Sequence, residues 1–138
     1  MQKRSDHNFD RIIDANFNRT KEGLRVCEDV CRYILNEQSS TRHYKSVRHQ
    51  LTQVLSGLNV PGLIRSRNIT GDVGRRSTDA EFKRRGAMDI YYANSQRVKE
   101  SIRVLEEFAK LRNKQIAGKL KRLRYRVYAL EKNVIERC

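Results

Sequence analysis

The sequence has little of what β-rich, secreted or membrane-spanning proteins require. Its 138 residues include one proline, seven glycines and no tryptophan, whereas 33% of them are charged. Sandwiches and barrels need many turn residues, so this composition favours an all-α protein of one domain with a single modest core. No apolar run approaches the length of a membrane span, and the initial MQKRSDHNFD does not resemble a signal peptide. We therefore expect a cytoplasmic protein without a membrane partner.

Cysteine is also scarce, and its pattern argues against two classes of site. The three cysteines are Cys27, Cys31 and Cys138, an odd number. Cys27 and Cys31 lie one helical turn apart with no second pair, so we expect neither a disulfide framework nor a zinc site. We interpret these two residues as small buried hydrophobic side chains.

Acidic residues are the minority among the charged ones. Lysine and arginine number 30 against 16 aspartates and glutamates, which gives a formal net charge of +14. Such a charge predicts an anionic partner, but nucleic acid and phosphorylated small molecules are attracted by the same field. The charge alone does not separate these two classes.

Two stretches of the chain are nearly the same. Residues 15–29 read ANFNRTKEGLRVCED and residues 93–107 read ANSQRVKESIRVLEE, an offset of 93 − 15 = 78. A weaker echo follows each stretch, because YKSVRHQL at 44–51 resembles LKRLRYRV at 120–127. The repeated unit is therefore a long helix, a turn and a second helix.

The hydrophobic spacing predicts four long helices. Their expected bounds are about 9–37, 41–56, 79–112 and 115–137. We expect an antiparallel four-helix bundle made of two repeated hairpins, about 9–56 and 79–137, joined by the loop 57–78. A loop of that length in a compact domain is usually functional or disordered.

Polar side chains interrupt the apolar face of both long helices. At 100° per residue, Asn16 and Arg19 fall in the middle of the apolar arc of the first helix. Asn94 and Arg97 take the matching places in the third helix. Desolvating an arginine without a partner is costly, so inward guanidinium groups require an anion or a carboxylate. The pattern predicts a ligand pocket between these two helices.

Neighbouring residues allow two interpretations of the inward arginines. Gly23 and Ser101 are small and would leave room for a ligand. Glu22 and Glu100 follow the arginines by three residues and could instead form simple intrahelical ion pairs. In the pocket hypothesis the glutamates orient the arginines, which donate to phosphate oxygens, while the asparagines bind the edge of an aminopyrimidine or similar heterocycle. The predicted substrate-binding residues are Asn16, Asn94, Glu22 and Glu100, with Arg19 and Arg97 as catalytic residues.

A further pair of arginines matches between the two halves. Arg48 and Arg124 lie at the edge of the second and fourth helical stripes. They could add substrate-binding donors from the facing side, or they could simply extend along the surface with their charges in water.

The loop between the hairpins predicts a nucleotide site. Within RSRNITGDVGRR, glycine N–H groups could approach a polyphosphate, and Thr70 and Asp72 could hold a magnesium ion. The GxxxxGK[ST] spacing of a P-loop is absent, so a flexible basic linker is the alternative. The predicted nucleotide-binding residues are Arg67, Thr70, Gly71 and Gly74, and Asp72 is the predicted metal-binding and catalytic carboxylate.

Four stretches, in order, resemble a known family. They read RIIDANFNRTKEGLRVCEDVCRYIL, RNITGDVG, YYANSQRVKESIRVLEEFAK and LRYRVYALE. Over roughly residues 9–135 the chain is similar to a small monofunctional hydroxymethylpyrimidine-phosphate kinase family, the helical module often fused N-terminal to thiamine-phosphate synthase. The resemblance implies phosphorylation of hydroxymethylpyrimidine monophosphate to its diphosphate, without action on the unphosphorylated alcohol. Because the barrel of the synthase is missing, we do not expect thiamine-phosphate synthase activity.

The leading hypothesis is a kinase for thiamine biosynthesis that depends on ATP and Mg²⁺. Its acceptor is already an anionic oxygen nucleophile, so the site needs charge neutralisation more than a general base. One alternative is a non-enzymatic basic helical RNA-binding protein, although the basic residues are spread over three predicted helices and not along one stripe. The other is a pyrimidine-phosphate-binding accessory module of thiamine-phosphate synthase, which we also expect as a functional partner. A homodimer could complete the bundle.

Overall fold

A computed structural model describes residues 2–77 and 83–138 of the chain. Within these residues the protein is all-helical, as predicted, with five α-helices and no strand. The α-helices are α1 (Gln2–Asp29), α2 (Gln38–Leu55), α3 (Val60–Arg65), α4 (Ala87–Ala109) and α5 (Lys114–Glu136). A π-helical turn, Val30–Ile34, extends α1, and a 3-10 turn, Ser56–Leu58, extends α2. None of the described helices combines the length and the apolar character that crossing a bilayer requires.

Three predicted bounds need correction. The first helix was expected to begin at about residue 9, but α1 begins at Gln2. The helix expected over 79–112 begins later, because residues 83–86 are not helical and α4 begins at Ala87, while residues 79–82 lie outside the described residues. The segment expected as a loop contains α3. Asn59 caps this short helix by accepting a hydrogen bond from the Gly62 N–H at 3.3 Å, and Pro61 lies in its first turn, where a missing N–H is harmless.

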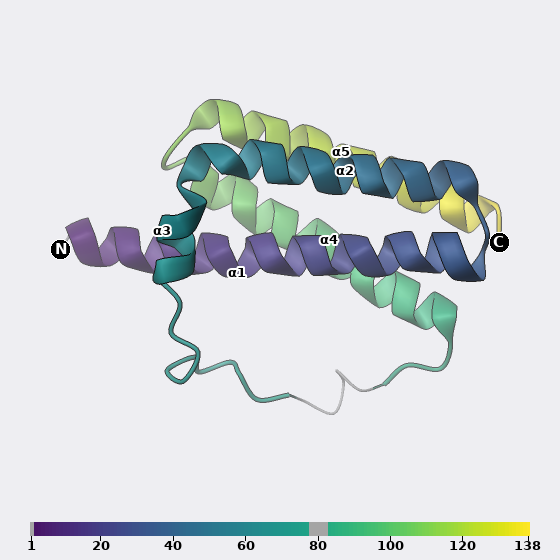
Figure 1. The fold of residues 1–138 in the computed structure, drawn as a ribbon, viewed down its shortest axis with the longest axis horizontal. Helices are drawn as coiled ribbons and strands as arrows, with labels where there is room; N and C mark the ends of the chain where they lie inside the picture. Colours follow the sequence, from purple (N-terminus) through teal and green to yellow (C-terminus); the bar gives the residue numbers. More distant parts are fainter. Residues whose placement is uncertain (1, 78–82) are drawn as a thin grey trace.

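The long helices pack in pairs (Figure 1). α1 lies beside α2, and α4 lies beside α5, each pair joined by a short turn. α4 crosses α1 obliquely, while α5 packs against both α2 and α4. α3 packs on α1, and residues 67–72, which follow α3, lie beside the first half of α1. This arrangement places the segment after α3 next to the polar face of α1.

Glycine sets how closely α1 and α4 approach. A Cβ atom at Gly23 would lie 2.6 Å from Val98 Cγ2 and 3.0 Å from the Asn94 carbonyl oxygen. One turn away, Thr20 and Ser101 share a buried hydrogen bond of 2.7 Å between their hydroxyl groups. The space beside Gly23 that we expected to admit a ligand is therefore filled by the neighbouring helix.

We expect Gly23→Ala to lower the free energy of unfolding by about 1–3 kcal/mol, since the added methyl group overpacks the helix crossing. The matched control is Gly118→Ala in α5, where a Cβ would meet nothing within 4 Å. That control should stabilise the protein by about 0.5–1 kcal/mol through helix propensity. Urea unfolding followed by circular dichroism measures both, and equal effects of the two substitutions would contradict the assigned role of Gly23.

Two buried glutamates join the long helices within each pair. Glu28 of α1 accepts from Arg48 of α2, with 3.1 Å between Oε1 and Nε, and Glu106 of α4 accepts from Arg124 of α5, with 2.5 Å between Oε2 and Nε. Both carboxylates are almost fully buried, at 2% and 3% exposure. The hydrogen bond that Arg124 donates to Glu106 holds the pKa of Arg124 above its usual value. Neither Arg48 nor Arg124 lines the cavities described below. Each arginine binds a buried glutamate where we predicted contact with the substrate.

The two helical cysteines are buried, as predicted. Cys27 and Cys31 are both fully inaccessible, and Cys27 Sγ lies 3.8 Å from the Tyr91 carbonyl oxygen. Burial raises the pKa of both thiols, that of Cys31 to about 11. Both side chains are therefore protonated and act as core residues.

Candidate functional site

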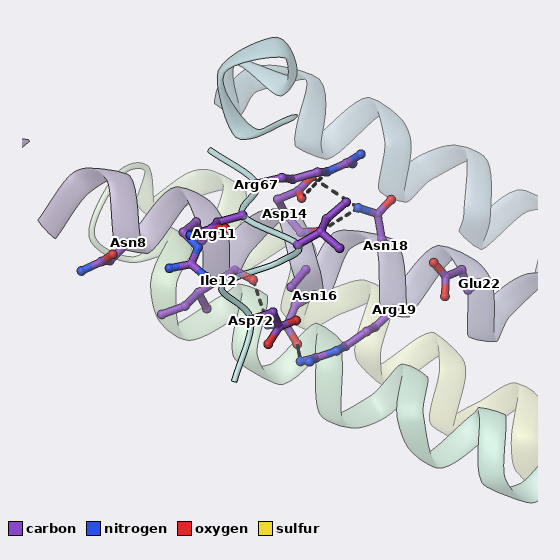
Figure 2. A pocket seen from close by; sticks show the side chains of 13 residues that line it. Asn8, Arg11, Ile12, Asp14, Asn16, Asn18, Arg19, Glu22, Arg67 and Asp72 are labelled. Carbon is purple, nitrogen blue, oxygen red and sulfur yellow. Dashed lines mark hydrogen bonds and ion pairs between the residues drawn. The ribbon is translucent and has the colours of Figure 1, made fainter. Parts of the chain in front are cut away.

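A cavity of about 750 Å³ lies between the first half of α1 and the segment that follows α3. Figure 2 shows its polar lining from both elements. The lining residues are Asn8, Arg11, Ile12, Asp14, Ala15, Asn16, Asn18, Arg19 and Glu22 of α1, with Arg67, Asn68, Ile69 and Asp72 of the following segment. On α1 these residues recur at intervals of three and four, so one helical face supplies most of the wall.

An ion pair fixes the segment after α3 to α1. Arg67 donates from Nε to Asp14 Oδ2 at 2.6 Å and from Nη2 to Oδ1 at 3.0 Å. Asp14 is 6% exposed, and Asn18 Nδ2 also donates to its Oδ1 at 3.3 Å. The hydrogen bonds from this arginine to the carboxylate raise the pKa of Arg67. Arg67 lines the cavity, but two of its guanidinium nitrogens donate to Asp14. The main role of Arg67 is therefore to position the loop.

Asn16 is buried in the wall, as predicted. It is 4% exposed, and its Nδ2 donates to the Ile12 carbonyl oxygen at 2.8 Å. Its Oδ1 accepts from Arg19 Nη1 at 3.4 Å. Asn94 makes the matching hydrogen bond in α4, from its Nδ2 to the Ile90 carbonyl oxygen at 2.8 Å. Asn94 lines neither this cavity nor the groove described in the next paragraph.

The prediction that Arg19 and Arg97 point into the protein interior is wrong. Both residues are exposed. They lie instead on an open groove between α1 and α4, a second cavity of about 390 Å³ that is lined by Asn16, Arg19, Ala93, Gln96, Arg97, Glu100, Ser101 and Val104. The helical wheel placed them on the face of each helix that borders the neighbouring one, but both side chains lie at an open groove and are not enclosed.

The glutamates do not hold these arginines. Among the described residues, the ion pairs include neither Arg19 with Glu22 nor Arg97 with Glu100. Glu100 accepts a hydrogen bond from Gln96 Nε2 at 3.0 Å, and Glu22 lines the main cavity. Both interpretations of the glutamates that the sequence left open, as orienting groups and as simple intrahelical partners, are therefore wrong in this structure.

The predicted nucleotide loop is folded by its own side chains. Asn68 Oδ1 accepts the Gly71 N–H at 3.0 Å, and Asp72 Oδ1 accepts the Gly74 N–H at 2.9 Å. Because these two N–H groups are already satisfied, they are not available to cradle a phosphate. Asp72 lines the cavity, whereas Thr70, Gly71 and Gly74 are exposed beside it.

The cavity wall is balanced in charge although the protein is strongly basic. It contains three arginines, Arg11, Arg19 and Arg67, and three carboxylates, Asp14, Glu22 and Asp72. Asp14 and Arg67 pair with each other, which leaves the guanidinium groups of Arg11 and Arg19 and the carboxylates of Glu22 and Asp72 in the same wall. Such a wall can bind an anion through the arginines and a cation through the carboxylates at the same time.

Several lining residues were not predicted. Asn8, Arg11, Asp14, Asn18 and Asn68 all face the cavity. The four on α1 continue the face that carries Glu22 toward the N-terminus, so following the wheel back from Glu22 to Asn8 would have found them. The partner of Asp14 lies 53 residues away, and helical spacing carries no information about such a contact.

The comparison with known proteins identifies the family. A family model, that of the ThiD2 family, matches residues 11–133. This chain belongs to the ThiD2 family. Among curated proteins it is 40% identical over 136 residues to a thiamine-phosphate synthase of Synechocystis sp., which covers 98% of this chain and 38% of that protein. A thiamine-phosphate synthase of Nostoc punctiforme is 38% identical over 126 residues, covering 91% of this chain and 35% of that protein.

A third curated relative has a similar identity. A thiamine-phosphate synthase of Rhodopirellula baltica is 38% identical over 120 residues, with 86% of this chain and 32% of that protein covered. The ThiD2 chain thus spans about a third of the length of the curated relatives it matches. No solved structure matches it significantly.

Proposed function

We propose that this ThiD2 protein is an ATP-dependent kinase that converts hydroxymethylpyrimidine monophosphate to the diphosphate in thiamine biosynthesis. The observation that carries the proposal is one cavity in which Arg11 and Arg19 of α1 meet Asp72 of the adjoining loop. The names of the relatives, all thiamine-phosphate synthases, support placing the chemistry in that pathway.

Phosphoryl transfer between these substrates requires charge neutralisation more than a base. A phosphate oxygen of the acceptor attacks the γ-phosphorus of ATP, the bond from that phosphorus to its bridging oxygen breaks, and ADP leaves with the bonding electrons. The acceptor dianion carries no proton on the attacking oxygen, so none has to be removed. Among the described residues that line the cavity there is no histidine, in keeping with this chemistry. Arg19 and Arg11 would hold the anionic oxygens together.

The residues of the cavity fit a magnesium ion. Proteins usually hold Mg²⁺ through one or two carboxylates, with substrate phosphates and water completing the shell. Asp72 is fixed by the Gly74 N–H on Oδ1, and Glu22 is a second carboxylate of the same wall. Within the described part of the chain no group of three or more potential metal ligands occurs, so the ion would depend on nucleotide phosphates. When bound, it would neutralise phosphate charge.

A coupled assay of ADP release tests the proposal. We expect turnover with ATP, Mg²⁺ and hydroxymethylpyrimidine phosphate, and roughly 10²-fold or greater loss of kcat/KM with the free alcohol, because the arginines would then lack their anionic partner. Equal rates with the two acceptors would contradict the assigned role of the arginines, and no turnover with either would reject the kinase.

The second candidate is an accessory module that binds the pyrimidine phosphate without chemistry. It is favoured by one observation: the chain corresponds to 38% or less of the relatives that carry the synthase name. Binding of the pyrimidine phosphate in calorimetry, combined with no ADP release, would support this candidate over the kinase.

We also infer that the bundle consists of two copies of one antiparallel hairpin. The Glu28–Arg48 and Glu106–Arg124 pairs tie each helix pair in the same way, with the glutamates offset by 106 − 28 = 78. The hydrogen bond from Asn16 to the Ile12 carbonyl oxygen and the one from Asn94 to the Ile90 carbonyl oxygen repeat at the same offset. The expected homodimer, the partnership with thiamine-phosphate synthase and the cytoplasmic location stay predictions.

A further inference from the structure

Two cavities meet at one ridge of α1. The main cavity of about 750 Å³ and the groove of about 390 Å³ between α1 and α4 share two lining residues, Asn16 and Arg19. Arg19 donates to Asn16 Oδ1, so its guanidinium group is held on the ridge between the cavities. Figure 2 shows this group directed toward Asn16 on the same side of α1 as Asp72. A ligand in either cavity would come within reach of Arg19.

The two cavities differ mainly in size. The main cavity has the carboxylates Asp72 and Glu22, which suit a phosphate chain that carries a divalent cation, and the apolar side chains of Ile12 and Ile69, which suit the face of a nucleotide base. The smaller groove has two apolar side chains, Ala93 and Val104, which suit the faces of a single aromatic ring.

Polar groups of the smaller groove match an aminopyrimidine phosphate. Gln96 donates through Nε2 to Glu100 Oε1 at 3.0 Å. The side-chain carbonyl oxygen of Gln96 and the second carboxylate oxygen of Glu100 can then accept hydrogen bonds from a ligand. Acceptors of this kind bind an exocyclic amino group. Arg97, in the same wall, offers a guanidinium group to the phosphate.

We propose that ATP occupies the main cavity and the pyrimidine monophosphate occupies the groove between α1 and α4, with Arg19 shared between them. This assignment rests on the proposed kinase function. The γ-phosphoryl group then moves across the ridge at Arg19, which contacts the attacking and the transferred phosphates together. Gln96 and Glu100 set the specificity for the amino-substituted ring, and Arg97 sets the requirement for its phosphate.

A split between kinetic constants tests the assignment. We expect Arg97→Ala to raise KM for the pyrimidine phosphate about 10- to 100-fold, as for a lost charged hydrogen bond, and to leave KM for ATP within about twofold. Asp72→Asn should raise KM for ATP and leave KM for the pyrimidine phosphate unchanged. Arg122→Ala, an exposed arginine of α5 outside both cavities, is the control and should change neither constant. An Arg97→Ala effect on ATP alone, or on neither substrate, would overturn the assignment.

Calorimetry keeps the assignment separate from the kinase activity. If the protein shows no turnover, the proposed function fails, but a non-hydrolysable ATP analogue and the pyrimidine phosphate can still be titrated one after the other. Two separate sites predict that each ligand binds when the other is saturating, and that Arg97→Ala weakens only the pyrimidine phosphate. Mutual exclusion of the two ligands would overturn the two-cavity assignment even if turnover is normal.

Discussion

Arg19→Ala is expected to lower kcat about 10³-fold, the loss that accompanies removal of an arginine from a phosphoryl-transfer site. The residue lines both cavities and its guanidinium group lies against Asn16 at 3.4 Å, where it would contact the two phosphates that must approach each other. Because Arg19 is exposed and forms no ion pair among the described residues, the substitution should leave helicity unchanged. Steady-state kinetics with circular dichroism on the same sample measures both quantities.

Two further variants serve as controls for Arg19→Ala. Arg25→Ala removes the same charge from the same helix at an exposed position outside both cavities, and it should retain wild-type kcat. Arg19→Lys keeps the charge but loses the forked geometry, so we expect only partial recovery. Full activity in Arg19→Ala, or an equal loss in Arg25→Ala, would show that the ridge between the cavities is not the site of transfer.

Arg124→Ala is expected to lower the free energy of unfolding by about 3–5 kcal/mol, because it leaves the carboxylate of Glu106 buried and unpaired. Glu106 is 3% exposed, and Arg124 provides both of its side-chain hydrogen bonds from within the described residues. A loss of this size is a large fraction of the stability of a domain of this length. Urea unfolding measures it.

The control lies on the same helix. Lys132 forms an exposed ion pair with Glu136, and Lys132→Ala should change stability by no more than about 0.5 kcal/mol. The double substitution Glu106→Leu with Arg124→Leu should recover most of the loss, since hydrophobic residues can replace a buried pair. A double variant as unstable as Arg124→Ala would show that the loss comes from packing and not from the unpaired charge.

The sequence predicted the parts of the fold that local spacing controls. The 3.6-residue periodicity predicted four long helices, which the structure contains as α1, α2, α4 and α5. The burial of Asn16 and of the two helical cysteines followed from the same wheel. Asp72, predicted as a metal-binding and catalytic carboxylate, lines the main cavity, and its role stays a prediction.

Long-range geometry was out of reach for the same reasoning. A helical wheel gives the direction of a side chain but not what covers it, so Arg19 and Arg97 were expected inside although both are exposed at the groove between α1 and α4. The meaning of Gly23 depends on Val98 and Asn94, which come from the other half of the chain. The partner of Arg67 is Asp14 of α1, which is far away in the sequence. The residue type of Arg67 alone therefore suggested a hydrogen-bond donor to a phosphate.

The central claim is tested most directly by ³¹P NMR of a mixture of the protein, ATP, Mg²⁺ and hydroxymethylpyrimidine phosphate. We predict that the single resonance of the monophosphate is replaced by the two coupled resonances of the pyrimidine diphosphate while the resonances of ADP grow. Persistence of the monophosphate resonance, with ATP intact or hydrolysed to ADP and inorganic phosphate, would contradict the account.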